Sequence, residues 1–382
     1  MDKKFDWKKP IKANIFKLRI LGLWPDGDDT YKVNLYTVWA TICLLVFNLG
    51  PNIFQTANIY FISDDLEAVI SNIFVMLSEF LSIIKAYYVV QNMRILKGLM
   101  VTLNCDLFQP RNAKQVKMVQ PSIEFWKTNY VLYWSVTLGA VFFLSFYPIL
   151  DKSGKEHQLP FMAWYPFDTT VSPVFEITYL YQIFGVTCSA ATALCVDCLI
   201  AALHVYIGAQ FDILSDNVEH LHDDSGDFDR KLIECVKHHK EIVRFAENTN
   251  TFSNWIILQQ FFISAVSIGM TMFQLTMVTP LSSEFFSQIS FLSSITTEIF
   301  MFCWYGNEVT IKSSKVPYAL FQSQWIDAPL VAQKNMQFFV ARCQKPVQMS
   351  ALKLFYLSLD TFVSILRASW SYFALLNQVN QR

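Results

Sequence analysis

The chain has 382 residues, of which 53% are hydrophobic and 16% are charged, and its net charge is −1. A soluble protein of this size carries about 25% charged residues, so the composition indicates a polytopic membrane protein. No basic tract or zinc-binding spacing is present, so the sequence gives no support for nucleic-acid binding. No cofactor pattern is recognisable either. The first 32 residues are of mixed charge and lack the short apolar core of a secretory signal.

Apolar segments of membrane-spanning length occur seven times along the chain, which predicts an all-α protein with seven transmembrane helices. Loops and termini on one side of the predicted spans contain 24 Lys and Arg residues in total, and those on the other side contain 3. The side richer in Lys and Arg is normally cytoplasmic, so we expect a cytoplasmic N-terminus and an extracellular C-terminus. This is the reverse of a G-protein-coupled receptor. The predicted spans are 33–57, 66–90, 129–149, 175–206, 252–279, 285–306 and 349–379.

These segments suggest four regions. Residues 1–32 form a cytoplasmic N-terminal segment, and 33–306 contain the first six spans. Within the latter, 209–252 keep apolar residues at helical spacing between charges, which predicts cytoplasmic extensions of the fourth and fifth helices. Residues 307–346 should form a cytoplasmic anchor helix, so that a helical anchor bundle lies on that side. Residues 347–382 are expected to hold the seventh helix.

Two features of the connections are informative. Gly50 and Pro51 should kink or break the first segment near its outer end. The third loop contains prolines and aromatic residues between Leu159 and Pro173. It is expected to form either an ordered, partly buried lid or an aromatic belt at the membrane interface.

Isolated charges lie inside the spans. Lys85 is expected to reach the inner interface, while Glu79 in the same helix needs a partner. Asp197 and His204 could form a proton relay, although interhelical hydrogen bonding is favoured. Glu298 is interpreted as a structural partner. Because no nucleophile–base arrangement appears, an enzyme is not predicted.

Four histidines near the acidic turn at Asp223 and Asp224 could suggest a metal site. The charged surface of a helical hairpin explains them better, so no metal is predicted. These histidines are His220, His222, His238 and His239.

The outer halves of the second, third, fourth and sixth helices combine aromatic, small and hydroxyl-bearing residues. This chemistry suits an apolar cavity for a small lipophilic ligand; ordinary helix packing is the alternative. The candidate pocket residues are Ser71, Phe74, Val75, Ser78, Val136, Gly139, Phe142, Phe143, Phe146, Tyr179, Gln182, Ile183, Ser287, Ser290, Phe291 and Ser294.

The last apolar segment lacks proline and glycine from Val347 to Val379 and is therefore expected to be one helix. Its polar residues share one face at about 100° per residue. Such a stripe cannot face lipid, so it must face protein or water. The stripe comprises Lys353, Asp360, Ser364, Arg367, Ser371 and Gln378.

From Cys303 onward the chain resembles the insect odorant receptor family. The matching motifs run through the last third of the sequence, with Trp370 where the family usually has Tyr and Asp360 where it often has Glu. They are Cys303-Trp304-Tyr305-Gly306-Asn307-Glu308-Val309, Val316, Ala319-Leu320-Phe321, Trp325, Pro329, Gln344-Lys345-Pro346, Ser350-Ala351, Phe355, Ser358-Leu359-Asp360-Thr361-Phe362 and Arg367-Ala368-Ser369-Trp370-Ser371-Tyr372-Phe373.

This resemblance implies a subunit of an odorant-gated, non-selective cation channel that passes monovalent and divalent cations. Four subunits would assemble through the cytoplasmic bundle, with the last helix of each lining a pore. Carried over from the family, Leu375 and Val379 form the gate, and Gln378 and Ser371 line the pore. The connection around Asp223 is short, as in the family's odorant-tuning subunits. The resemblance therefore implies a tuning subunit that works with a co-receptor in a heterotetramer.

The implied location is the plasma membrane of an olfactory sensory neuron dendrite, and the implied ligand is a small volatile molecule. The alternative function is that of a gustatory-type receptor channel that forms homotetramers. That sister family shares the spacing of Tyr372 and Gln378. A multipass carrier would instead require ionisable groups shared between helices at mid-membrane.

Overall fold

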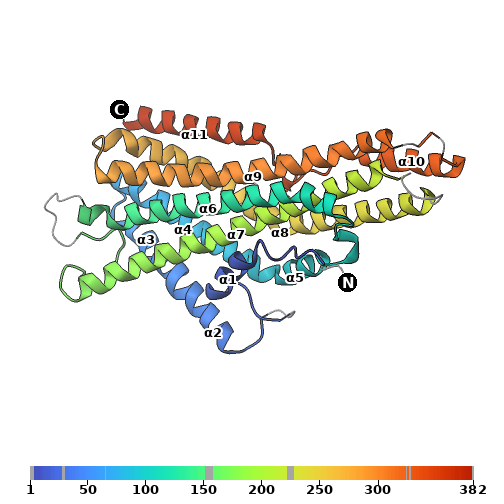
Figure 1. Cartoon of the computed structure of the whole chain (residues 1–382). Coiled ribbons are helices and arrows are strands. Elements are labelled where there is room, and N and C mark those ends of the chain that lie inside the picture. Colours follow the sequence, from blue (N-terminus) through green and yellow to red (C-terminus); the bar gives the residue numbers. More distant parts are fainter. Residues whose placement is uncertain are drawn as a thin grey trace.

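The computed structural model describes residues 4–27, 31–64, 66–150, 158–221, 228–323, 325–326 and 328–380. Long helices run side by side along most of the molecule (Figure 1). The end where residues 158–173 join two of these helices is called the loop end. The opposite end, which carries α10 (Leu330–Cys343), is called the anchor end.

Helices dominate the described residues, and six helical segments there are long and apolar enough to cross a membrane. With α11 they give the expected seven-helix membrane topology, because 22 residues extend about 33 Å, close to the thickness of a bilayer core. The remaining helical elements are α1 (Lys12–Ile20), α2 (Leu35–Ile42), π-helix η1 (Cys43–Leu49), α3 (Gly50–Phe61), α4 (Leu66–Gln91), α5 (Met93–Thr102), 3₁₀-helix η2 (Asp106–Phe108), α6 (Ala113–Leu150), α7 (Val174–Glu219), α8 (Phe228–Met277), α9 (Ser283–Gln322) and α11 (Leu359–Asn380).

The first membrane segment changes helix type along its length. A π-helical stretch, η1, ends at Leu49, and α3 begins at Gly50 with Pro51 in its first turn. Proline is tolerated there because its missing N–H would have no partner in the helix. Tyr181 approaches closely, since a Cβ at residue 50 would clash with its hydroxyl oxygen. The helix type therefore changes at the predicted Gly50-Pro51 position, but the backbone of Gly50 stays helical and the segment is not broken there. The absence of a side chain at Gly50 makes room for α7.

Three helices continue past the membrane-length segments toward the anchor end. The buried face of α7 extends to Val218, and α8 begins at Phe228 with buried residues throughout its first half. There α9 meets α10. The predicted extensions at 209–252 are thus helical, although the acidic turn around Asp223 and Asp224 lies outside the described residues. Residues 307–346 do not form one anchor helix, because α9 runs to Gln322 and α10 is separate.

The N-terminal segment is fixed to this end of the bundle. Trp7 is fully buried, and its indole N–H donates to the carbonyl of Phe108 at 3.1 Å. The hydroxyl of Tyr206 on α7 donates to the carbonyl of Trp7 at 2.8 Å. The segment therefore packs on the core helix α7.

The prediction of one helix from Val347 to Val379 is wrong. A short hairpin precedes α11. Its two-residue strands, β1 (Ser350–Ala351) and β2 (Phe355–Tyr356), pair antiparallel. Leu352 and Lys353 at its tip have positive φ angles of 52° and 61°, as in type I′ turns. Lys353 is consequently not part of the helical stripe.

Contacts distant in sequence explain the hairpin. The Ser350 N–H donates to the side-chain oxygen of Asn250 on α8 at 2.8 Å. The Val347 N–H donates to the Ser313 hydroxyl on α9 at 3.0 Å. The Ser358 hydroxyl then accepts from the Thr361 N–H at 3.2 Å, in the manner of a helix N-cap. These side chains satisfy backbone donors that a longer helix would have satisfied internally.

Candidate functional site

A cavity of about 100 Å³ lies among α4, α6, α7, α8 and α9 in the membrane-length part of the bundle. Apolar side chains form much of its wall, and polar groups gather at one side. Its lining residues are Val75, Ser78, Glu79, Leu81, Lys85, Tyr133, Thr137, Ala140, Val141, Leu144, Val186, Ser189, Ala190, Ala193, Leu194, Gln260, Ile263, Ser264, Ser267, Phe291, Ser294, Ile295 and Glu298.

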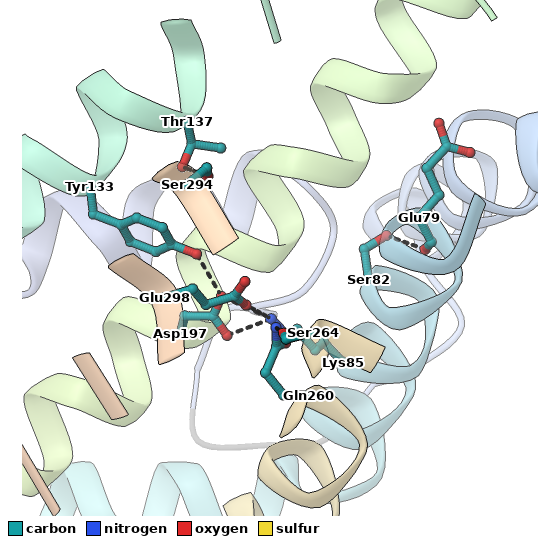
Figure 2. Close-up of polar contacts among 10 residues, drawn as sticks. All are labelled: Glu79, Ser82, Lys85, Tyr133, Thr137, Asp197, Gln260, Ser264, Ser294 and Glu298. Atoms are coloured by element: carbon teal, nitrogen blue, oxygen red, sulfur yellow. Dashed lines mark hydrogen bonds and ion pairs between the residues drawn. The ribbon is translucent and has the colours of Figure 1, made fainter. Parts of the chain in front are cut away.

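Three charged residues in or beside this lining form an ionic cluster, whose side chains are drawn in Figure 2. The ammonium of Lys85 lies 2.7 Å from Asp197 and 2.6 Å from Glu298. The hydroxyl of Tyr133 donates to Asp197 at 3.2 Å. The cluster thereby joins α4, α6, α7 and α9, and burial makes its charge pairing strongly interdependent.

The expectation that the charges inside the spans are isolated is wrong, because the cluster shares them between helices. This arrangement also corrects the expectation for Lys85. Its side chain is fully buried and does not reach the interface, because two carboxylates from other helices receive its charge. The interpretation of Glu298 as a structural partner is confirmed by its contact with Lys85. Glu79 is also buried, and its carboxylate is turned away from Lys85 (Figure 2).

The proposed relay between Asp197 and His204 is not formed. Asp197 is engaged with Lys85 and Tyr133, whereas neither ring nitrogen of buried His204 has a hydrogen-bond partner among the described residues. His204 instead borders a separate cavity of about 290 Å³ together with Trp304 and Glu308.

The histidine and acid pattern brings together no set of three or more metal-ligating side chains within the described residues. His238 shares a hydrogen bond with the Gln210 side chain at 3.0 Å, and His239 packs edge-on against Phe339. Both are core residues of the anchor end. His222 lies outside the described residues.

Four of the sequence-predicted pocket residues line the main cavity: Val75, Ser78, Phe291 and Ser294. Phe74 stands behind them, with its ring centroid 4.9 Å from that of Phe291. For Ser71, the side chain lies outside the described residues.

The other predicted residues lie beside the cavity or toward the loop end. Phe142 is 51% exposed on the outside of α6, and its ring contacts those of Phe143 and Phe146. The hydroxyl of Tyr179 donates to the carbonyl of Ser145 at 2.7 Å. The remaining residues away from the cavity lining are Val136, Gly139, Gln182, Ile183, Ser287 and Ser290.

The observed lining differs from the predicted one in the rotation of α6 and in its depth along α7. The lining face of α6 includes Thr137 and Ala140, each one residue after a predicted position, which turns the face by about 100°. On α7 the lining begins at Val186, deeper than the predicted Ile183. A further wall comes from Gln260 and neighbouring residues of α8, and no periodic pattern in the sequence distinguished this face.

The third loop folds over the loop end of these helices. Gln182 on α7 accepts from the Phe161 N–H at 3.1 Å and donates to its carbonyl at 3.0 Å and to the Tyr165 hydroxyl at 3.2 Å. Burial raises the pKa of Tyr165, and the Gln182 bond acts against that change. Phe161 and Tyr165 are both buried. The loop is thus ordered and partly buried, as one of the two expectations had it, while Trp164 and Phe167 are exposed.

At its surface the loop carries a turn that Asp168 closes. The N–H and hydroxyl of Thr170 both donate to Asp168, at 2.9 and 2.7 Å. These bonds stabilise the carboxylate and lower the pKa of Asp168.

The last helix is held on one side only. Ile365 and Ser369 of α11 are buried, and Gly269 of α8 lies so close that a Cβ there would sit 2.8 Å from the Tyr372 Cβ. Farther along the helix, Leu375 and Val379 are 57% and 52% exposed. The predicted pore residues Ser371 and Gln378 are also exposed, so all four lie away from the protomer's own core.

These features define a multipass helical membrane protein with a cavity among five of its helices and one helix that presents a polar face outward. A family model, the 7tm Odorant receptor, matches residues 65–370. The chain belongs to this odorant receptor family, whose members are receptors and not enzymes.

Curated relatives agree over nearly the whole chain. Odorant receptor Or1 of Anopheles gambiae is 24% identical, with 98% of this chain and 96% of the relative covered. Odorant receptor 46a, isoform A, of Drosophila melanogaster is 24% identical, with 95% and 96% covered.

A solved structure shows the same fold. The insect olfactory receptor OR5 from Machilis hrabei, in complex with eugenol, superposes with a TM-score of 0.87 at 20% identity. The match covers 98% of this chain and all of OR5. The same receptor without eugenol gives a TM-score of 0.86.

Proposed function

We propose that this chain is the odorant-tuning subunit of a ligand-gated, non-selective cation channel, assembled with co-receptor subunits into a heterotetramer. The observation that carries the proposal is the outward polar face of α11. Its Asp360, Ser364 and Arg367 are exposed on the isolated protomer.

A charged side chain at the centre of a bilayer costs about 2.5–3.5 kcal/mol on insertion scales. A helix that carries Asp360 and Arg367 on one exposed face is therefore poorly placed against lipid. The same face continues through Ser371 to Gln378, and the other face already packs on α8. Water in a shared pore, with neighbouring subunits around it, is the environment that suits this face.

Near the C-terminal end of α11 the exposed face becomes more apolar. Leu375 and Val379 lie one turn apart on it, and hydrophobic constrictions can gate a pore by excluding water. We assign these two residues to the gate and Gln378 and Ser371 to the pore lining. Monovalent and divalent cations are the proposed permeant ions.

The ligand in this proposal is a small volatile molecule bound in the cavity among α4, α6, α7, α8 and α9. It opens the channel only if it binds the open arrangement more tightly than the closed one. By the distribution of Lys and Arg, the anchor end and N-terminus are cytoplasmic and the C-terminus is extracellular. The proposed location is the plasma membrane of an olfactory neuron dendrite.

The test is to express the chain with and without a co-receptor and to record currents under a panel of odorants. We expect odour-evoked cation currents only with the co-receptor. Leu375→Ala and Val379→Ala should raise the basal current, because smaller side chains widen the constriction and admit water. Absence of any current at confirmed surface expression would refute the channel assignment.

A further inference from the structure

The charges of the ionic cluster do not cancel. One ammonium, that of Lys85, serves two carboxylates, those of Asp197 and Glu298. If all three groups are ionised, one negative charge remains without a cation in the cluster. A buried carboxylate in excess needs hydrogen-bond donors to stabilise it.

Glu298 is the most exposed of the three charged members of the cluster. The side chains of Lys85 and Asp197 are fully buried, whereas that of Glu298 is 10% exposed, and Glu298 lines the cavity. One Glu298 oxygen contacts Lys85 at 2.6 Å. Its carboxylate is therefore the acceptor that the cluster offers to a molecule in the cavity.

A second acceptor lies on α8. Gln260 is 2% exposed and lines the same cavity. Its side-chain NH₂ donates to the Ser264 hydroxyl at 2.8 Å, but its oxygen has no hydrogen-bond partner among the described residues. Such a buried, unsatisfied carbonyl is stabilised by a ligand that donates to it.

Most hydroxyl donors around the cavity are already used. Ser78 donates to the carbonyl of Phe74 at 3.2 Å, and Ser189 donates to the side chain of Asn48 at 3.3 Å. Thr137 and Ser294 bond to each other at 2.7 Å. The Ser267 hydroxyl, which can donate or accept, is unpartnered among the described residues. The Ser264 hydroxyl accepts from Gln260 and can also donate. These hydroxyls can serve a ligand as donor or acceptor, whereas the Glu298 carboxylate and the Gln260 carbonyl can only accept.

We infer that the cavity selects small volatiles that carry an O–H or N–H donor, recognised by the Glu298 carboxylate and the Gln260 carbonyl. Alcohols, phenols and amines fit this chemistry, and ethers, esters and hydrocarbons of the same size do not. The inference rests on the proposed odorant-gated function and names the ligand class of the same cavity.

The experiment compares isomeric pairs in which one member has a hydrogen-bond donor and the other has none, such as hexanol against methyl pentyl ether, and a cresol against anisole. Primary amines form a third arm. Currents are recorded from the full chain co-expressed with a co-receptor. The donor-bearing member should be at least about tenfold more potent, because a site built around hydrogen bonds rejects analogues that leave its groups unpaired.

Two variants then locate the acceptors. Glu298→Gln removes the excess charge but leaves the Lys85–Asp197 pair, and Gln260→Leu removes an acceptor without touching the cluster. Each should reduce the preference for the donor-bearing isomer several-fold. Gln288→Leu is the matched control, since Gln288 is buried but does not line the cavity, and it should preserve the preference.

The outcomes separate the two proposals. If no odorant evokes a current at confirmed surface expression, the proposed function fails. If odorants do evoke currents but both isomers are equally potent, or all agonists lack a donor, the ligand class is wrong. An unchanged preference in both Glu298→Gln and Gln260→Leu overturns the residue assignment.

Discussion

The helices α7 and α11 both carry charged groups along their membrane-length segments, but the charged group of α7 is buried and those of α11 are exposed. Asp197 of α7 is fully enclosed and paired with Lys85, within a helix whose residues from Leu194 to Leu214 are almost all buried. Asp360 and Arg367 of α11 are exposed. Charge on the core helix therefore joins helices of the protomer, whereas charge on α11 contributes to the exposed surface of the protomer, for which we propose a pore.

The largest effect is expected from breaking the enclosed charge. Lys85→Ala leaves the carboxylates of Asp197 and Glu298 buried without their cation, which should destabilise the protein by about 3–5 kcal/mol. Thermal unfolding of the purified protein and its level at the cell surface both report this loss. The matched control is Lys4→Ala, which removes an exposed pair with Asp106 and should leave unfolding unchanged.

A triple substitution in the same cluster should recover part of the stability that Lys85→Ala loses. Replacing all three groups by neutral residues, as Lys85→Met with Asp197→Asn and Glu298→Gln, leaves no unpaired charge. It should restore part of the lost stability. If Lys85→Ala unfolds at the wild-type temperature, the cluster does not hold these helices together.

A smaller effect is expected at the one-sided contact of α11. Gly269→Ala would place a Cβ 2.8 Å from the Tyr372 Cβ and 3.0 Å from the Ser369 carbonyl oxygen. This overpacking costs about 1–3 kcal/mol and pushes α11 away from α8, toward the proposed pore axis. The maximum odour-evoked current should fall several-fold at equal surface expression.

Gly139→Ala is the control for this substitution. It lies in the membrane-length helix α6, and a Cβ there would meet nothing within 4 Å. It should leave the current at its wild-type level. Equal currents for Gly269→Ala and Gly139→Ala would show that the contact between α8 and α11 does not affect opening.

The sequence predicted the helices well because their signals are local. Runs of apolar residues, the Gly50-Pro51 step and helical spacing in 209–252 depend on neighbours in the chain. The odorant receptor motifs after Cys303 likewise predicted the family correctly. These features need no knowledge of which helix packs against which.

The failures concern contacts between distant residues. Nothing near Ser350 indicates that Asn250 will accept its N–H and favour a hairpin over helix. Lys85 finds its carboxylates 112 and 213 residues away. The cavity face of α6 differs from the predicted one by a single position, because the rotation of a helix is set by its neighbours and aromatic residues occur on several of its faces.

The central claim is that the exposed face of α11 lines an aqueous pore. Cysteine substitution on both faces, followed by a charged, thiol-reactive methanethiosulfonate reagent during odour-evoked current, tests it directly. Because Leu375 and Ser371 are exposed and Ser369 is fully buried, Ser371→Cys and Leu375→Cys should be modified with a change in current, and Ser369→Cys should not. Equal modification of both faces, or modification of Ser369→Cys alone, would contradict the account.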